Sequence, residues 1–195
     1  MIDFSPMKDD MNAIAALSDG LTATDLRALT NEMIDHMLGL VDGCVDADVI
    51  FVPQDPHAFD EWAASEDEVT LSWTLAHVIV HVTASAEEAA FLAAELARGV
   101  KWRGGRSRSE VPWQTVTSMA QVRHRLEESR RMRLATLDIW PDKPYLANAR
   151  RRTRDLHLNA VAQFLLGLKH DTDHLEQIAN IVNQAKANRK QALAI

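Results

Sequence analysis

The sequence predicts an all-α protein, and within that class a four-helix bundle with long connecting loops. Only 7 Gly and 6 Pro occur in 195 residues, and long stretches are rich in Ala, Leu, Glu and Arg. Four long segments repeat apolar residues at the spacing of one helix face. Four such segments joined by loops predict a bundle. The length predicts one domain, residues 1–195, with its core over about 20–188.

The first long helix is expected to follow a short helix at residues 7–17. It begins at Thr22 or Thr24, which are suitable N-cap residues, and it ends near Gly43. Its apolar residues recur at helical spacing, and they are Leu26, Leu29, Met33, Met37, Leu40 and Val41. Residues 45–69 contain a β-branched patch and two prolines, and they predict an extended loop across one end of the domain.

The second long helix is predicted to begin at Thr70 or Ser72 and to close at Gly99. Its N-terminal half is apolar almost all round, which is typical of a central helix. The apolar residues between 78 and 82 also suit a buried strand. The length of the segment and its continuation rich in Ala and Glu favour the helix.

Two further helices complete the predicted bundle. The third runs from about Thr117 to Leu137 and ends before two prolines. A basic loop that contains glycine, VKWRGGRSRSEVPWQ, precedes it. The fourth helix runs from about Thr153 to Lys186. Its expected buried stripe consists of Leu158, Val161, Phe164, Leu165, Leu168, Ile178 and Ile181.

The net charge of -7 conceals an asymmetry between the two halves of the chain. Residues 1–97 carry 2 Lys and Arg against 19 Asp and Glu, whereas residues 98–195 carry 19 against 9. Opposite charge in the two halves favours packing of the first helices on the last. The total is acidic and the arginines lack interleaved aromatic residues, so no nucleic-acid partner is expected.

The composition also indicates a compartment. The single cysteine, Cys44, excludes an intrachain disulfide framework and is expected to be a small buried group. The N-terminus lacks the apolar core of a signal peptide, and no run approaches eighteen apolar residues without charge. We therefore expect a cytoplasmic protein with no membrane partner.

Two pairs of histidines carry the main chemical signal. His170 and His174 are four residues apart on the fourth predicted helix, and His77 and His81 share this spacing on the second. Residues at i and i+4 lie on one face of a helix, with Cβ atoms about 5 to 6 Å apart. Facing helices of a bundle are a usual place for a metal site, and neutral imidazole binds Zn, Ni, Cu and Fe(II). The same spacing also fits hydrogen-bonded or solvated histidines, which leaves both interpretations open.

Two short motifs resemble those of the DinB/YfiT-like family. In LSWTLAHVIVHV, Trp73, Thr74 and His81 match the signature of the second helix, in which a histidine follows the Trp by eight residues. In KHDTDHLEQI, the last-helix signature is matched by His170, Asp171, His174, Gln177 and Ile178. The resemblance covers roughly residues 20–185, and helix order and chain length agree with it.

This resemblance implies a four-helix bundle in which three histidines hold a divalent metal, nickel or zinc. Carried over to this chain, the ligands are His81, His170 and His174. Three protein ligands leave positions open for water or substrate, as in a catalytic site. Gln177 and His77 are then expected to line the pocket or to support the ligands. A small-molecule substrate and a homodimer are expected as well.

The second helix departs from the family pattern at two positions. The family often has an acidic residue about five positions after the ligand histidine, but this chain has Ala86 there, followed by Glu87 and Glu88. Glu88 is expected to be a solvated carboxylate. His77 stands where the family is often acidic or polar. A fourth ligand, a supporting group and a substrate contact are its possible roles, of which we favour a support or pocket-lining role.

Other candidate groups carry weaker signals. Asp171 and His174 have a spacing used in di-iron bundles, but that design needs a second copy and further carboxylates, which the sequence lacks. His57 reaches the metal if its loop folds over the site. Four histidines are expected at the surface or at the edge of the core, namely His36, His57, His124 and His157.

Two functions from different classes follow from these patterns. The first is a metal-dependent enzyme, a thiol-dependent transferase or a hydrolase, because a metal with open positions activates a bound thiol or water. Members of the wider family include enzymes that use mycothiol or bacillithiol. The second is a non-catalytic, stress-associated metal-binding or dimerising bundle. In the basic loop, three arginines are candidates for a carboxylated substrate or for solvent contact, namely Arg103, Arg106 and Arg108.

Overall fold

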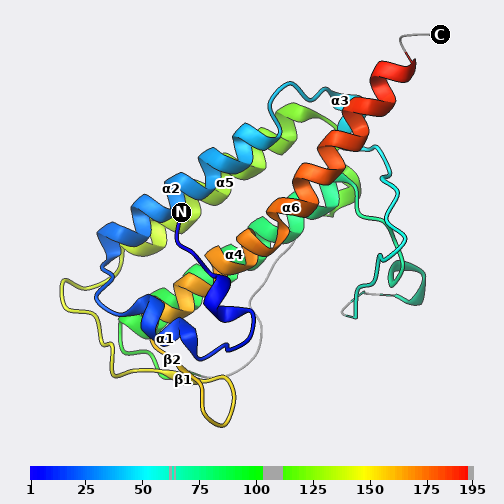
Figure 1. Ribbon diagram of the computed structural model, residues 1–195. Coiled ribbons are helices and arrows are strands. Elements are labelled where there is room, and N and C mark those ends of the chain that lie inside the picture. The colour runs from blue at the N-terminus through cyan, green and yellow to red at the C-terminus, as the bar shows by residue number, and fades with distance from the viewer. Residues whose placement is uncertain (62, 64, 103–111, 193–195) are drawn as a thin grey trace.

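Four long helices dominate the described part of the chain (Figure 1). The computed structural model describes residues 1–61, 63, 65–102 and 112–192. The long helices are α2 (Ala23–Leu40), α4 (Leu75–Ala97), α5 (Met119–Asp138) and α6 (Ala160–Ala192). The predicted all-α fold class is therefore confirmed.

In the described residues, short elements precede α2 and occupy the connections between the long helices. Two are α-helices, α1 (Ala13–Ser18) and α3 (Asp46–Val49). Three are 3₁₀ turns, η1 (Ser5–Met7), η2 (Glu66–Glu68) and η3 (Trp113–Thr115). The strands β1 (Arg150–Arg151) and β2 (His157–Leu158) pair antiparallel, with Arg150 opposite Leu158. The extended loop predicted at 45–69 thus contains two short helical segments.

The central helix of the bundle is α4. It packs most extensively against α6 and next against α5, and α2 lies against α5 and α6. Figure 1 shows α2 beside α5, and it shows the C-terminal turns of α6 projecting beyond the other long helices. Val78, Ile79 and Val82 of α4 are fully buried. By length and composition α4 is apolar enough to cross a membrane, and 67% of its apolar window is buried within the protein.

Side-chain caps determine where the long helices begin. Thr22 caps α2 as predicted, in a capping box with Asp25. The predicted start of α4 at Thr70 or Ser72 is wrong, because the side chain of Thr74 accepts a hydrogen bond from the His77 backbone N–H. The helix therefore begins at Leu75.

The predicted limits of α6 are also corrected. The chain before it forms the β1–β2 hairpin, so the helix cannot begin at Thr153. It begins at Ala160, where the Asn159 side chain accepts a hydrogen bond from the Ala162 backbone N–H at 2.9 Å. It continues to Ala192, beyond the predicted end at Lys186.

A glycine allows α4 and α6 to approach each other closely. Gly167 of α6 faces α4, and a Cβ atom built on it would lie 3.0 Å from the Ala89 Cβ and 3.1 Å from the Ala86 Cα. Contacts this short leave no room for a methyl group. Gly167 lies one turn before His170, so the close approach is adjacent to the predicted metal site.

Buried ion pairs connect α5 to the neighbouring helices. Arg133 pairs with Asp171 of α6, and both side chains are almost completely buried. The Arg133 Nε also donates to the Ser129 Oγ at 3.0 Å. Burial raises the pKa of Asp171 to about 6, and Arg133 opposes this rise. A second buried pair joins Arg125 to Glu87 of α4.

Further ion pairs also link the acidic and basic halves of the chain. Arg130 pairs with Asp35 at 2.6 Å, and Arg189 pairs with Asp48 at 3.1 Å. These pairs join α5 to α2 and the end of α6 to α3. Charge asymmetry in the sequence therefore appears in the fold as contacts between early and late helices.

Candidate metal centre

The two central helices bring three histidines together. His81 lies on α4, and His170 and His174 lie one turn apart on α6. Their ring centroids are 4.7 to 5.0 Å apart. One nitrogen from each ring lies within 4.8 Å of the other two. The predicted metal-ligating residues therefore converge in space, which neither helix achieves alone.

The separation of the nitrogens fits a shared metal ion. The Nε2 atoms of His81 and His170 are 3.0 Å apart. Two nitrogens that each bind one zinc ion at about 2.0–2.1 Å lie roughly 3 Å from each other. All three side chains are half-buried, so the cluster is neither sealed in the core nor fully solvated. This geometry suits an ion that also contacts a molecule from outside.

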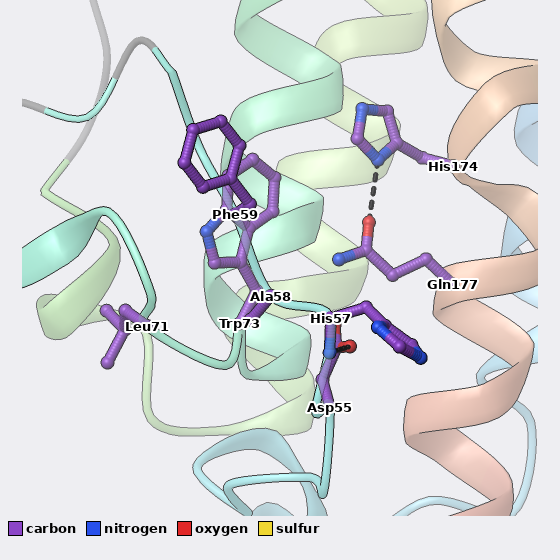
Figure 2. A pocket seen from close by; sticks show the side chains of 8 residues that line it. All are labelled: Asp55, His57, Ala58, Phe59, Leu71, Trp73, His174 and Gln177. Carbon is purple, nitrogen blue, oxygen red and sulfur yellow. Dashed lines mark hydrogen bonds between the residues drawn. The ribbon is translucent and has the colours of Figure 1, made fainter.

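Gln177 fixes the proton of His174. Its Oε1 lies 2.7 Å from the His174 Nδ1 (Figure 2). Because an amide oxygen accepts, His174 carries its proton on Nδ1 and keeps the Nε2 lone pair available. Metal-binding histidines usually donate their other N–H in this way. The place of Gln177 thus agrees with the supporting role expected from the resemblance.

A stack of aromatic rings borders the cluster. His77 lies between Trp73 and Trp113, with ring centroids at 4.3 and 4.6 Å and interplanar angles of 18° and 4°. Trp73 in turn lies 4.7 Å from the His81 ring and 5.9 Å from the His174 ring. Trp73 is half-buried and covers the histidines.

His77 is therefore separate from the three converging histidines. Its ring contacts tryptophans, and His77 is not among the residues whose nitrogens converge in the described chain. Burial lowers the pKa of His77 to about 4 and also lowers the pKa of His174. Both rings are consequently neutral near pH 7, and neutral imidazole is the form that binds metals.

Two pockets reach the cluster from different sides. The smaller, of about 220 Å³, is lined by His174, Gln177, Trp73 and His57 together with Asp55, Ala58, Phe59 and Leu71. Figure 2 shows His57 below Gln177, with Phe59 and Trp73 across the pocket from His174. The larger, of about 690 Å³, contacts His81 and His170. Molecules can thus approach all three histidines from outside the bundle.

A family model describes the sequence that forms this site. The model of the DinB superfamily matches residues 14–178, which include the histidine cluster. The chain belongs to the DinB superfamily. No curated protein and no solved structure gives a significant match. The DinB resemblance seen in the two short motifs is therefore confirmed over most of the chain.

The other candidate residues from the sequence lie outside the histidine cluster. Asp171 faces Arg133 in the core, so it does not complete a carboxylate metal site with His174. Glu87 pairs with Arg125, and Glu88 is half-buried in the wall of the larger pocket, where a solvated carboxylate was expected. Three candidate arginines lie outside the described residues, namely Arg103, Arg106 and Arg108.

The remaining single residues are placed as follows. His36, His124 and His157 are exposed, as predicted. His57 is exposed too, but its loop brings it to the smaller pocket beside His174. Cys44, which was expected to be buried, is half-buried, and desolvation raises the pKa of its thiol.

Sequence reasoning missed several residues around the cluster. Trp113 stacks on His77, and Trp102 and Arg150 line the larger pocket. The two tryptophans stand at either end of the basic loop before α5, and their presence in a polar segment was a usable signal. Arg150 gave no such signal, because it is one of several arginines in a row.

Proposed function

We propose that this DinB protein is a metal-dependent enzyme that activates a small thiol or a water molecule, as a transferase or a hydrolase. The observation that carries the proposal is the convergence of the three imidazoles at a point that two pockets reach. A closed structural site would use four protein ligands, whereas three leave room for a reactant. Fold membership alone does not argue for catalysis, so the proposal rests on the site.

Each neighbouring side chain has a defined task in this proposal. His81, His170 and His174 hold the ion, and Gln177 keeps the His174 proton on Nδ1. A divalent ion bound there supplies Lewis acidity, which lowers the pKa of a coordinated water or thiol. Trp73 covers one side of the cluster and excludes solvent from it.

His57 is the group placed to move a proton in the smaller pocket. It is exposed on a loop, and it lines the same pocket as His174 and Gln177 (Figure 2). Among the pocket's described side chains, His57 carries an imidazole that is not one of the three converging on the proposed ion. We assign it the role of accepting the proton that the nucleophile releases.

Metal uptake is the first test of the proposal. Protein prepared without a histidine tag and reloaded with zinc or nickel, the two metals we propose, should bind one equivalent per chain. Elemental analysis after gel filtration measures this. Less than one equivalent from either metal would contradict the proposal.

Thiol activation is the second test. In cobalt-loaded protein, a small thiol should change the visible absorption spectrum by direct ligation. The His81→Ala variant is the control, because it removes one proposed ligand. Metal uptake with neither a thiol effect nor hydrolytic turnover would favour a non-catalytic metal-binding bundle instead.

The wider setting of the protein is also a proposal. We propose a cytoplasmic homodimer that acts on a small molecule and binds neither nucleic acid nor membrane. Light scattering after gel filtration measures the mass in solution. A monomer at micromolar concentration would contradict the homodimer.

A further inference from the structure

The larger pocket extends from the histidine cluster to the β1–β2 hairpin. Its volume is about 690 Å³, and small-molecule sites commonly have roughly 300–1,000 Å³. His81 and His170 lie in its wall, and so do Gln163, Trp102, Arg150 and Arg152. The pocket is therefore large enough for a molecule that touches both the cluster and the hairpin.

Arg150 presents a charged group to this pocket. Its guanidinium carbon lies 4.7 Å from the centroid of the Trp102 ring. The Nε atom is buried and has no hydrogen-bond partner among the described residues. A guanidinium that lies over an aromatic ring can still donate N–H bonds to a planar, two-oxygen acceptor. A carboxylate has that shape and charge.

Gln163 supplies a second polar group in the pocket wall. Only 2% of it is exposed, yet its Oε1 has no hydrogen-bond partner among the described residues. Buried polar atoms are normally satisfied, so an oxygen in this state indicates a ligand donor. A hydroxyl or amide N–H of a bound molecule would satisfy it.

The positions on α6 give the length of the expected ligand. Gln163, Gly167 and His170 follow one another at intervals of four and three residues, so they lie along one face of the helix. A rise of 1.5 Å per residue places Gln163 about 10 Å from His170 along the helix axis. A molecule that reaches from the cluster past Gln163 is therefore elongated.

Charge in the pocket favours an anion once an ion is bound. Its acidic side chains are Asp60, Glu88 and Asp173, and its basic side chains are Arg150, Arg152 and Lys169. Asp173 and Lys169 pair with each other at 2.6 Å. The described lining side chains are neutral overall, and a divalent ion would add two positive charges at one end. An anionic group is therefore attracted to the pocket.

We infer that the larger pocket binds an elongated carboxylic acid, with its carboxylate on Arg150 and its reacting end at the histidine cluster. Gln163 accepts a hydrogen bond from the middle of the molecule. This inference rests on the proposed function, because it identifies the substrate class of the same site. Arg150 is thus a specificity-determining residue, and its carboxylate contact selects the acid over the corresponding amide.

Binding of simple carboxylates tests this inference directly. The probes are linear dicarboxylates of increasing length and the monoamide of each, titrated into zinc-loaded and metal-free protein by calorimetry and ligand-observed NMR. Zinc-loaded protein should bind a long dicarboxylate at least about tenfold more tightly than its monoamide. Equal affinity for acid and monoamide at every length would overturn the inference.

Three variants assign the effect to Arg150. Arg150→Gln should remove the preference for the acid. Arg150→Lys should keep part of it, because lysine carries the positive charge but lacks the paired N–H donors of a guanidinium. Arg151→Gln is the matched control, since Arg151 is the next residue on β1 but is exposed and outside the pocket lining. Thermal unfolding checks that each variant folds. A preference that survives Arg150→Gln, or one that Arg151→Gln also removes, would overturn the assignment.

The metal-free arm separates this inference from the proposed function. Arg150-dependent binding of monocarboxylates should persist there, although more weakly, because the guanidinium does not depend on the ion. Failure of zinc uptake with retained Arg150-dependent binding would refute the metal enzyme and support the subsite. Normal zinc uptake without Arg150-dependent binding would support the proposed metal site and refute the carboxylate subsite.

Discussion

The faces of α4 and α6 carry two polar regions that differ in how their groups are satisfied. Toward α5, Asp171 meets Arg133 and Glu87 meets Arg125, so each buried carboxylate has a basic partner within the chain. At the cluster, His81 and His170 share a contact between like atoms, Nε2 to Nε2 at 3.0 Å. This contact is a hydrogen bond between two imidazoles, in which the tautomers decide which ring donates.

This difference separates groups that stabilise the fold from groups that we propose serve a reaction. The side chains of Arg133 and Asp171 are almost inaccessible, and those of Arg125 and Glu87 are largely covered. The three histidines are half-buried and open into two pockets. Buried polar groups that complete one another contribute to structure, whereas those that converge beside a pocket are prepared for an external partner.

Removing one member of a closed pair should have the largest effect. Asp171→Ala leaves the Arg133 charge buried and unpaired, which should lower the free energy of unfolding by about 3–5 kcal/mol. The double variant Arg133→Met with Asp171→Leu should recover most of this loss, because it leaves no charge in the core. Urea unfolding measures both. A double variant as unstable as the single would show that the pair itself, rather than the unpaired charge, governs stability.

Removing a cluster histidine should affect metal affinity much more than stability. His81→Ala should weaken zinc binding by more than about 100-fold, a loss greater than is typical for supporting groups. His77→Ala is the matched control one turn away on α4, and it should change zinc affinity by less than about tenfold. Competition with a chromophoric chelator measures both constants. The opposite order would place the site one turn nearer the N-terminus of α4.

Variants of Gln177 test whether its hydrogen bond to His174 supports zinc binding. Gln177→Leu removes the acceptor for the His174 N–H, and it should weaken zinc binding by about 10–100-fold. Gln177→Glu keeps an acceptor at the same length and should bind zinc at least as well as the natural residue. The same competition assay applies. If the two variants behave alike, the hydrogen bond does not orient His174.

The acid stability of the metal-free protein should reveal the stacked histidine. The pKa of His77 is lowered from 6.5 to about 4, so the folded state disfavours its protonation. The unfolded chain takes up this proton below pH 6.5 and the folded protein only below about pH 4. The free energy of unfolding is therefore at its full value above pH 6.5 and decreases as the pH falls from 6.5 to 4. His77→Phe keeps a ring in the stack but does not titrate. It should lose about 1 kcal/mol less than the natural protein over this window, a value reduced because the side chain is partly exposed.

Urea unfolding at several pH values measures this last effect. The His36→Phe variant is a suitable control, because His36 is exposed on α2. It makes the same exchange of side chains at a position outside the stack, so it reports the effect of the substitution itself. A His77→Phe profile parallel to that of the natural protein would show that His77 does not contribute to acid sensitivity.

Local signals in the sequence explain why the long helices were predictable. Apolar periodicity and the Thr22 cap are properties of neighbouring residues, and the structure preserves them. The starts of α4 and α6 were not predictable in this way. Thr70, Ser72 and Thr153 are chemically as good as the caps used, and hairpin pairing between Arg150 and Leu158 decides the second case.

In the candidate site too, some residues were predictable from local sequence signals and others were not. Spacing and the family motifs point to His81, His170 and His174, because residues four apart in the sequence lie on one face of a helix. Contacts such as that of Arg150 with Trp102 join segments far apart in the chain. No sequence pattern near either residue predicts such a contact. The stack around His77 depends in the same way on the fold and not on spacing.

The close contact at Gly167 has a consequence for the choice of ion. The hydrogen atom of this glycine stands where any other residue would place carbon against Ala86 and Ala89. A methyl group there would require Ala86 or Ala89 to shift by a few tenths of an ångström, one turn away from His170. The width of the coordination site is therefore governed by a residue without functional groups. The metal preference that we propose should therefore respond to Gly167→Ala as well as to changes in the histidines.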